Sequence, residues 1–415
     1  MRAIAAVFAA LLCIAAERQG ARGVDWPQWG GPTRDFHGAG VEWTPWPASG
    51  PTYLWQRPLG EGYSAIASVG DTLYTMYRRG EEEVVVAIAA ATGATRWEHA
   101  YPATWLSGMD AQQGPGPHAT PLVYRDRVYA AGATGVLHAL DSKTGRVLWR
   151  LRLIEDLNGT KVMRGYSSSP LAYHDWIIVQ IGGDGHAVLA LDPADGRVVW
   201  RGGSFVNVNS SPIVARVAGE DHIVALGSGE VIGLDARTGA PRWSHPHPHR
   251  FRENIPTPIW SNGLLFITSY ADGGSRVLEL RRRNEQTVVR ELWHHTRLRV
   301  YYTNVIRIGD YAYGSSGDAG ATIYTAVNIT SGEVAWQSRE IARSSAVATG
   351  NRVLLRDDEG HLTLATVTPS GITVLATAPV LSGGPATPPT AVGTRVFARD
   401  RHKLIALDLG PRGGR

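Results

Sequence analysis

The chain is organised around a short segment that recurs along most of its length. The clearest copy, residues 135–149, contains an apolar stretch ending at Asp141, a tight turn ending at Gly145, and a second stretch ending at Trp149. The Asp side chain can accept backbone N–H groups in an Asx turn, and Gly can adopt positive φ where the second stretch begins. Each copy is therefore predicted to be a β-hairpin.

The spacing of the copies predicts the architecture. The tryptophans that end successive copies are 42, 52, 51, 43, 50 and 43 residues apart, and a degenerate copy with Leu375 in the tryptophan position follows. A period of about 40 to 50 residues is typical of four-stranded propeller blades. The repeat tryptophans are Trp55, Trp97, Trp149, Trp200, Trp243, Trp293 and Trp336.

Counting the repeats predicts a closed ring. Seven complete repeats lie between residues 63 and 377, and residues 387–408 supply an eighth that stops before its last strand. Residues 53–57 offer the missing strand, which would leave no open sheet edge. We therefore expect an all-β, eight-bladed β-propeller of four-stranded antiparallel blades, closed by an N-terminal strand that completes the last blade.

The rest of the chain divides around this body. Residues 1–23, with an apolar run after Arg2 too short to span a bilayer, are predicted to be a signal peptide. Residues 24–50 carry four tryptophans among Gly and Pro and are expected to form a strap that buries them against the propeller, residues 51–410. Residues 411–415 are expected to be a disordered tail. The protein would then be periplasmic or secreted, with no transmembrane span, and we expect a monomer.

Charge gives no case for nucleic acid. The formal net charge is +4, and the densest basic run, residues 281–283, is followed at once by polar residues, as expected of a solvated hairpin tip. No nucleic-acid partner is expected.

The loops that enter the central funnel carry the candidate binding residues. Each loop precedes the first strand of a blade, and together they hold converging donors suited to a small anionic ligand or an acidic peptide. A polar, water-filled channel is the alternative. The candidates are His118, Arg164, Tyr166, Asn207, Asn209, Arg252, Asn254, Tyr302, Asn304 and Arg343.

No metal site is expected. The turn acids Asp141, Asp192 and Asp235 each offer one carboxylate, where a calcium loop offers several, so we assign them to the structure of the repeat. The alternating residues 245–249 (His-Pro-His-Pro-His) could place three imidazoles on one side of an extended chain, but no further ligand lies nearby in the sequence.

The repeats resemble those of the pyrroloquinoline-quinone (PQQ) type, in the quinoprotein alcohol dehydrogenase-like superfamily. The segments 139–149 and 190–200 match the Ala-Leu-Asp, Thr-Gly-turn and Trp pattern most fully, although the second has Ala-Asp-Gly in its turn. The resemblance implies either a quinoprotein dehydrogenase, with PQQ and calcium in the funnel, or a scaffold such as the BamB propellers of outer-membrane protein assembly.

The sequence favours the scaffold. It lacks the adjacent cysteines that many such enzymes place over the cofactor, and the funnel loops show no acidic pair with a nearby Asn. We expect a non-catalytic binding or assembly scaffold for envelope or secreted proteins, with no cofactor. The alternative is a PQQ-dependent oxidoreductase, or another enzyme that uses the funnel loops; its catalytic residues are not identified.

Overall fold

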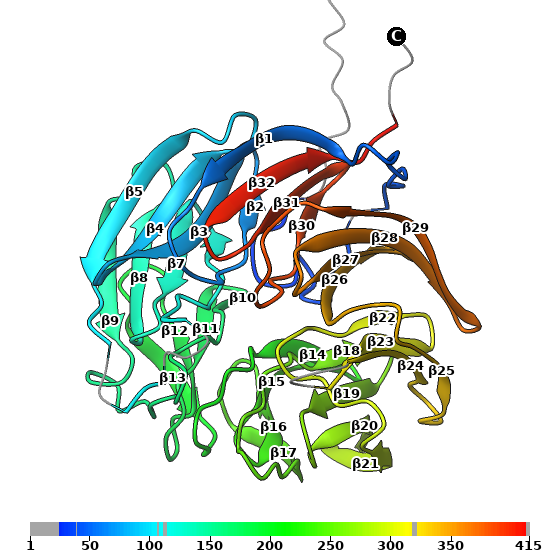
Figure 1. Ribbon diagram of the computed structural model, residues 1–415. Coiled ribbons are helices and arrows are strands. Elements are labelled where there is room, and N and C mark those ends of the chain that lie inside the picture. The colour runs from blue at the N-terminus through cyan, green and yellow to red at the C-terminus, as the bar shows by residue number, and fades with distance from the viewer. Residues whose placement is uncertain (1–24, 39, 106–107, 111–113, 318–321, 412–415) are drawn as a thin grey trace, which may run out of the picture.

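The computed structural model describes residues 25–38, 40–105, 108–110, 114–317 and 322–411. They form eight four-stranded antiparallel sheets arranged around an axis (Figure 1). The expected eight-bladed β-propeller is confirmed. The predicted signal peptide, residues 1–23, and nearly all of the predicted tail lie outside the described residues.

The strands follow one another blade by blade. Blades 1 to 4 are β2 (Ala67–Val69), β3 (Thr72–Arg79), β4 (Glu82–Ala89), β5 (Thr95–Pro102); β6 (Leu122–Tyr124), β7 (Arg127–Ala131), β8 (Val136–Asp141), β9 (Val147–Arg152); β10 (Leu171–Tyr173), β11 (Trp176–Gln180), β12 (Val188–Leu191), β13 (Val198–Gly202); and β14 (Ile213–Val217), β15 (Glu220–Leu226), β16 (Glu230–Asp235), β17 (Pro241–Pro246). Blades 5 to 8 are β18 (Ile259–Ser261), β19 (Leu264–Ser269), β20 (Gly274–Arg283), β21 (Gln286–His295); β22 (Ile306–Ile308), β23 (Tyr311–Ser316), β24 (Ile323–Asn328), β25 (Val334–Ser338); β26 (Ser344–Thr349), β27 (Arg352–Asp357), β28 (His361–Thr368), β29 (Gly371–Pro379); and β30 (Thr390–Val392), β31 (Arg395–Arg399), β32 (Lys403–Asp408), β1 (Thr52–Pro58).

The N-terminal strand closes the ring as expected. Strand β1 pairs antiparallel with β32, from Thr52 opposite Asp408 to Pro58 opposite Lys403. The buried Arg399 of blade 8 adds a second fastening, because its guanidinium donates to the carbonyls of Met76 at 2.7 Å and Ser64 at 3.2 Å in and before blade 1. Burial lowers the pKa of Arg399 to about 9.

The hydrophobic core lies between the blades. The buried apolar side chains of the described residues form eight clusters, and each cluster joins two neighbouring blades. Blade 1 against blade 2, for example, buries Met76 and Val85 with Val128 and Leu140. A single blade therefore leaves both of its faces uncovered, and the ring gains its burial only as a whole.

Each repeat tryptophan follows a β-bulge. Trp149 pairs with Ala139 and Val147 with Leu140, so that Leu148 is left without a ladder partner. The same register shift occurs in the last pairing of all eight blades. A bulge re-aims the side chain that follows it, and here it sets the direction of the indole.

The bulge corrects the assignment of blade 7. Leu375 is the bulged residue there, and Ala376, paired with Leu364, occupies the tryptophan position. A count along the sequence does not allow for the bulge, so it places the tryptophan position at Leu375, one residue too early. In six of the other seven blades the residue paired with the repeat tryptophan is Ala or Gly, and in blade 5 it is Val277. In blade 7 the sizes are reversed, because the small Ala376 stands in the tryptophan position and the larger Leu364 is paired with it.

The indoles dock on the hairpin turn of the next blade. Trp97 Nε1 donates to the Ser142 carbonyl at 2.9 Å, and a Cβ built on Gly145, whose φ is +72°, would lie 2.5 Å from the indole. The turn glycine is thus required twice, for positive φ and for close approach. Four more indole nitrogens donate to a carbonyl in the next blade, from Trp55 to Ala90, Trp149 to Pro193, Trp293 to Ile329 and Trp336 to Thr368.

Polar side chains join the blades near the axis. The backbone N–H of Thr120 donates to Ser169 Oγ at 3.0 Å, and that of Ser169 donates to Ser211 Oγ at 2.9 Å. Asn304 uses both ends of its amide on the backbone of Ala346, each at 2.8 Å. The Ser/Thr-Pro steps that precede the first strands thus belong to the structure of the ring.

The strap crosses the base of the ring, the end at which the first strands of the blades finish. Trp26 pairs with Ser68 of β2, and His37 forms a bridge with Ala348 of β26. Arg34, which is buried, donates to the carbonyls of Ser169 at 3.2 Å and Pro170 at 2.9 Å.

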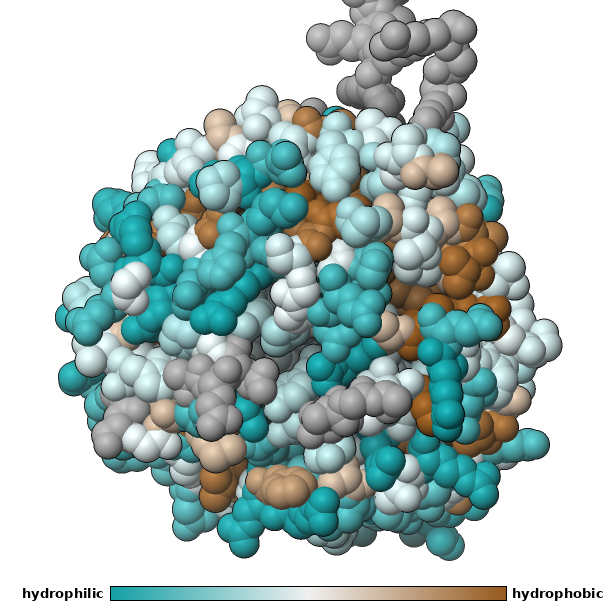
Figure 2. All heavy atoms as spheres, in the orientation of Figure 1, coloured by the Kyte–Doolittle hydropathy of each residue, from teal (hydrophilic) through white to brown (hydrophobic). Residues whose placement is uncertain are grey.

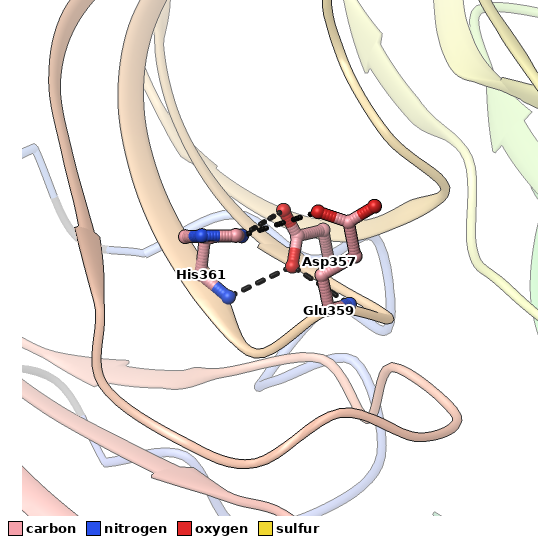
Figure 3. Close-up of side chains that lie close together, drawn as sticks. All are labelled: Asp357, Glu359 and His361. Atoms are coloured by element: carbon pink, nitrogen blue, oxygen red, sulfur yellow. Dashed lines mark hydrogen bonds and ion pairs between the residues drawn. The ribbon is translucent and has the colours of Figure 1, made fainter.

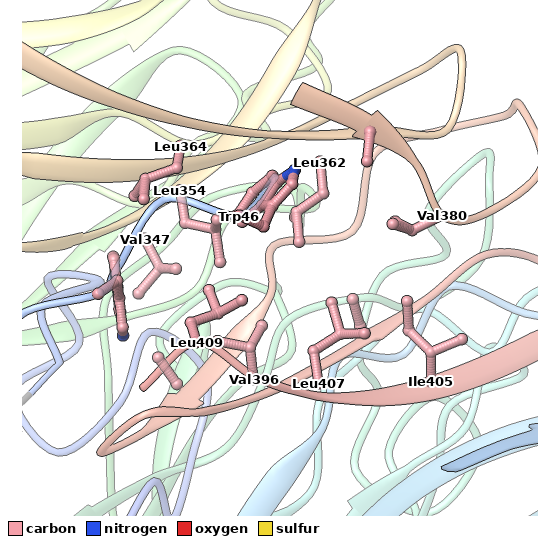
Figure 4. Close-up of a cluster of buried hydrophobic side chains, with 14 of the residues drawn as sticks. Trp46, Val347, Leu354, Leu362, Leu364, Val380, Val396, Ile405, Leu407 and Leu409 are labelled. Carbon is pink, nitrogen blue, oxygen red and sulfur yellow. The ribbon is translucent and has the colours of Figure 1, made fainter. Parts of the chain in front are cut away.

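The strap tryptophans fill the interface between blades 7 and 8. Trp46 packs there among Leu362, Leu364 and Leu407 (Figure 4). Trp43 belongs to the same buried cluster. This is the interface to which a tryptophan at position 376 would contribute, so the strap supplies aromatic volume that blade 7 lacks.

A buried carboxyl group fastens blade 1 to a loop of blade 2. Glu83 accepts hydrogen bonds from the Tyr101 hydroxyl at 2.7 Å and from the Ala133 backbone N–H at 3.0 Å. Burial raises the pKa of Glu83, although both hydrogen bonds act in the opposite direction. The group is fully enclosed.

Gly145→Ala tests the docking of the indole, with Gly80→Ala as its matched control. Both glycines have positive φ, but an added Cβ at Gly80 meets nothing within 4 Å. The control should lose about 1 kcal/mol from its φ alone, and Gly145→Ala should lose about 2 kcal/mol more through the clash with Trp97. Urea unfolding measures both. Equal losses would contradict the steric role of the turn.

Glu83→Gln should remove a pH dependence of stability. Because the folded pKa of Glu83 lies above its unfolded value, its favourable contribution is fully present below the unfolded pKa and is lost as pH rises through the folded pKa. The variant should therefore gain thermal stability relative to the wild type as pH increases. Melting curves across this range check it, with the exposed Glu81→Gln as a control; parallel curves for all three proteins would refute the prediction.

Candidate functional site

An axial cavity of about 1020 Å³, including its opening, lies at the mouth of the ring, the end at which the first strands of the blades begin. All eight blades contribute, through the segments that precede or begin their first strands. The lining includes Tyr63, His118, Arg164, Asn209, Thr257, Tyr302, Thr303, Asn304, Ser345 and Thr387.

The strap also reaches the cavity. Trp29 is part of the lining, and its Nε1 donates to Thr257 Oγ1 at 2.8 Å. Phe36 holds the indole from the strap side in an edge-on contact, with 5.1 Å between ring centroids. Sequence reasoning expected the strap to bury its tryptophans but did not place Trp29 in the site, because local composition does not say which blade a strap residue meets.

Arg164 lies between two carboxylates. Its Nη1 is 3.6 Å from Asp110 Oδ2, and its Nε is 3.6 Å from Glu253 Oε1. Its guanidinium also lies over the Tyr302 ring, 5.8 Å from the centroid. Burial opposes the charge, but the electrostatic influence of Tyr302, Glu253, Tyr301 and Asp110 outweighs it and raises the pKa of Arg164. The guanidinium therefore stays protonated, and the two carboxylates balance its charge.

An aromatic ladder runs from the surface to the cavity. Phe251 stacks on Tyr270 with 6.2 Å between centroids, Tyr270 stacks on Tyr301 at 4.8 Å, and Tyr301 contacts Tyr302 at 3.9 Å. The Tyr301 hydroxyl donates to Glu253. Burial, and then this hydrogen bond, raise the pKa of Tyr301 well above its usual range.

His118 forms the opposite wall. Its ring stacks on Tyr63 with 5.7 Å between centroids and a 3° interplanar angle. Burial lowers the pKa of His118 to about 4, so the imidazole is neutral at neutral pH. Its Nε2 has no hydrogen-bond partner among the described residues, and the same holds for Asn209 Oδ1 and Thr303 Oγ1.

The structure brings half of the ten candidate residues together. Those that line the cavity are His118, Arg164, Asn209, Tyr302 and Asn304. Arg343 lies beside them, because its guanidinium is 6.0 Å from the Tyr302 centroid, and it pairs with Asp358 at 2.7 Å.

The other four candidates have different surroundings. Asn254 is buried and donates to the Gly227 carbonyl at 2.6 Å, and Asn207 accepts from Gln180 at 3.2 Å. Tyr166 packs in the core between blades 2 and 3, whereas Arg252 is exposed. Asp110 and Glu253, both partly buried, complete the surroundings of Arg164. Sequence reasoning did not select them, because the sequence does not show which acid meets the funnel arginine.

The three histidines of residues 245–249 do not gather around one point. His247 is fully buried, bonds Ser269 Oγ at 2.8 Å and accepts from Arg276 Nε at 2.8 Å. Burial lowers its pKa to about 3. His245 instead lies 3.5 Å from Glu291. The segment therefore serves the structure of blades 4 and 5.

One group of possible metal ligands occurs among the described residues, formed by Asp357, Glu359 and His361 (Figure 3). Asp357 Oδ1 already accepts the backbone N–H groups of Glu359 at 3.0 Å and His361 at 2.8 Å. Asp400 accepts two backbone N–H groups in the corresponding turn of blade 8. Turn formation thus explains the group.

Comparison with known proteins finds relatives of this chain. The model of the family described as outer membrane protein assembly factor BamB matches residues 80–338. The protein of that name from Burkholderia pseudomallei is 30% identical over 126 residues, which are 30% of this chain and 29% of the relative. The one from Yersinia pestis is 22% identical over 294 residues, 64% of this chain and 70% of the relative. The chain thus spans less than a third of the first relative, and its partners are not assigned by the match.

Solved structures share the fold. BamB from Moraxella catarrhalis superposes with a TM-score of 0.61 at 19% identity, covering 86% of this chain and 100% of the other. Quinohemoprotein alcohol dehydrogenase from Comamonas testosteroni gives 0.60 at 13% identity, covering 94% and 81%. At these identities the likeness concerns the fold alone, whereas the family model matches more than half of the sequence. The protein therefore belongs to the family of the outer membrane protein assembly factor BamB.

Proposed function

We propose that this protein is a non-catalytic scaffold of the cell envelope that docks partner proteins on the mouth of its ring. The proposal rests first on the family, whose named relatives are outer membrane protein assembly factors. Residues 1–23 would direct the chain to the envelope as a signal peptide.

One surface feature carries the docking site. Met163, Val206 and Phe251 are 50%, 49% and 52% exposed, and they lie in the loops that precede the first strands of blades 3, 4 and 5. Much of the surface in Figure 2 is hydrophilic, with separate hydrophobic groups. Apolar side chains on three consecutive loops of one rim are what a protein partner buries at the centre of an interface.

The flanking charges suit a polar rim around these anchors. Arg250 lies over the Phe251 ring at 4.7 Å from its centroid, and Arg252 is exposed beside it. An acidic segment of the partner would meet both arginines while its apolar residues cover Phe251.

The cavity lining does not fit PQQ with calcium. The described lining residues include one carboxylate, Asp110, which already faces Arg164 at 3.6 Å. The Asn304 amide is already used, because its Nδ2 donates to the Ala346 carbonyl and its Oδ1 accepts from the Ala346 N–H. Calcium takes six to eight oxygen ligands, so the oxidoreductase alternative would need a donor set other than this one.

No helix in the described part of the chain is long and apolar enough to cross a membrane.

The paired variant Met163→Ser with Phe251→Ser should weaken docking strongly. Val288→Ser with Val374→Ser is the matched control, because these side chains are 44% and 45% exposed on outer strands of blades 5 and 7. A photo-crosslinker at position 251 identifies the partner in cells, and one at position 288 gives the background. With the purified partner, the rim pair should weaken binding by about 100-fold, as for two central anchors, and the control should not. Equal effects of the two pairs would contradict the docking site.

PQQ with calcium should leave the protein unchanged. We expect no shift of the melting temperature and no dye-linked oxidation of alcohols or sugars, because the lining lacks a calcium donor set. A saturable shift together with dye reduction would replace the scaffold by an oxidoreductase.

A further inference from the structure

The axial cavity contains hydrogen-bonding atoms that the described residues leave unsatisfied. They are His118 Nε2, Asn209 Oδ1 and Thr303 Oγ1, each with almost no accessible surface of its own and each on a side chain of the lining. Other side chains around the axis are used in bonds between blades, as at Ser169 and Asn304. Buried polar atoms in native proteins are nearly always satisfied, by protein, water or ligand.

These atoms include both donors and acceptors. Neutral His118 presents Nε2 as an acceptor, because its other nitrogen bonds the Arg164 backbone and its pKa is about 4. Asn209 Oδ1 can only accept, and Thr303 Oγ1 can donate or accept. A matching ligand must itself donate and can also accept, as hydroxyl groups do.

The charges of the cavity favour a neutral ligand. Arg164 has Asp110 and Glu253 at 3.6 Å each, so an anion would meet carboxylates beside the cation. A cation would meet the guanidinium itself. A charged ligand would lose its hydration on entering this site, and no protein charge of opposite sign is free of a counter-charge to offset that loss.

The aromatic rings give the cavity apolar faces. Trp29 lines it from the strap, the stacked Tyr63 and His118 from one wall, and Tyr302 from the other. A sugar ring combines C–H faces that pack on aromatic rings with hydroxyl groups at its edge.

We infer that the axial cavity is a binding site for a neutral saccharide of one or two rings. The site is separate from the docking rim, and the inference does not depend on the proposed scaffold function. The neighbours of Arg164 favour this ligand over the small anion expected from the funnel arginines alone.

Three sugars that share one ring test the charge rule. Glucose is neutral, glucuronate carries a carboxylate and glucosamine an ammonium, and each is titrated by saturation-transfer NMR against the full chain at millimolar concentrations. We expect glucose to give a saturable signal with the lowest Kd. Trehalose and the disaccharide of N-acetylglucosamine then separate a free-sugar site from one for cell-wall glycan, through which of them binds more tightly than glucose.

Two substitutions place the signal in the cavity. Asn209→Ala and Thr303→Val each remove one unsatisfied atom, and each should weaken binding about fivefold, the value of one neutral hydrogen bond. Asn351→Ala, an exposed asparagine in the turn between β26 and β27, is the control and should bind as the wild type does. Melting curves show whether the variants are folded, and the three-sugar comparison on the wild type does not depend on them.

Several results would overturn the inference. They are no saturable signal from any neutral sugar, tighter binding of glucuronate or glucosamine than of glucose, or equal binding by Asn209→Ala, Thr303→Val and the wild type. Val206→Ser, which changes an exposed rim residue outside the aromatic ladder, should leave sugar binding unchanged. Failure of partner docking and failure of sugar binding are therefore separate outcomes.

Discussion

The packing of a tryptophan from one blade on the glycine turn of the next is the interaction on which the structure depends. The buried apolar clusters all lie between blades, so a blade has no adequate core of its own. The bulge before Trp97 aims the indole, Ala87 opposite it leaves room, and Gly145 lets it approach and bond the turn. Repetition of this contact converts eight marginal sheets into one stable body.

A ring built from pairwise contacts has its weakest point where the pattern fails. Blade 7 has Ala376 in the tryptophan position, and it borders the blade that is assembled from both ends of the described chain. Two devices reinforce this region. Trp43 and Trp46 of the strap fill the interface between blades 7 and 8, and Arg399 bonds blade 8 to the backbone of blade 1. The strap is therefore part of the core.

The repeat was predictable from sequence because Asp, Gly and Trp each have one physical task that recurs at a fixed spacing. What depends on contacts between distant segments was not. The bulge shifts Leu375 to Ala376, which the spacing alone cannot reveal. The location of Trp29 in the cavity depends on the path of the strap across the ring. Among the funnel residues, Arg164 and Asn254 look alike in sequence, but only the first faces the cavity while the second bonds the Gly227 carbonyl.

The same ring of loops therefore carries two kinds of polar residue, and the distinction defines the site. Asn304 is satisfied by the neighbouring blade and holds the wall in place, whereas Asn209 keeps an unsatisfied oxygen in the lining. The aromatic ladder connects this cavity to the surface, since Phe251 on the rim stacks through Tyr270 and Tyr301 to Tyr302 beside Arg164. A partner that covers Phe251 thus packs on the outer end of the wall whose inner end contacts the ligand, and it reduces the freedom of that wall. Rigidifying a wall before the second molecule binds lowers the entropy that this molecule must lose, so occupancy of the rim should favour occupancy of the cavity.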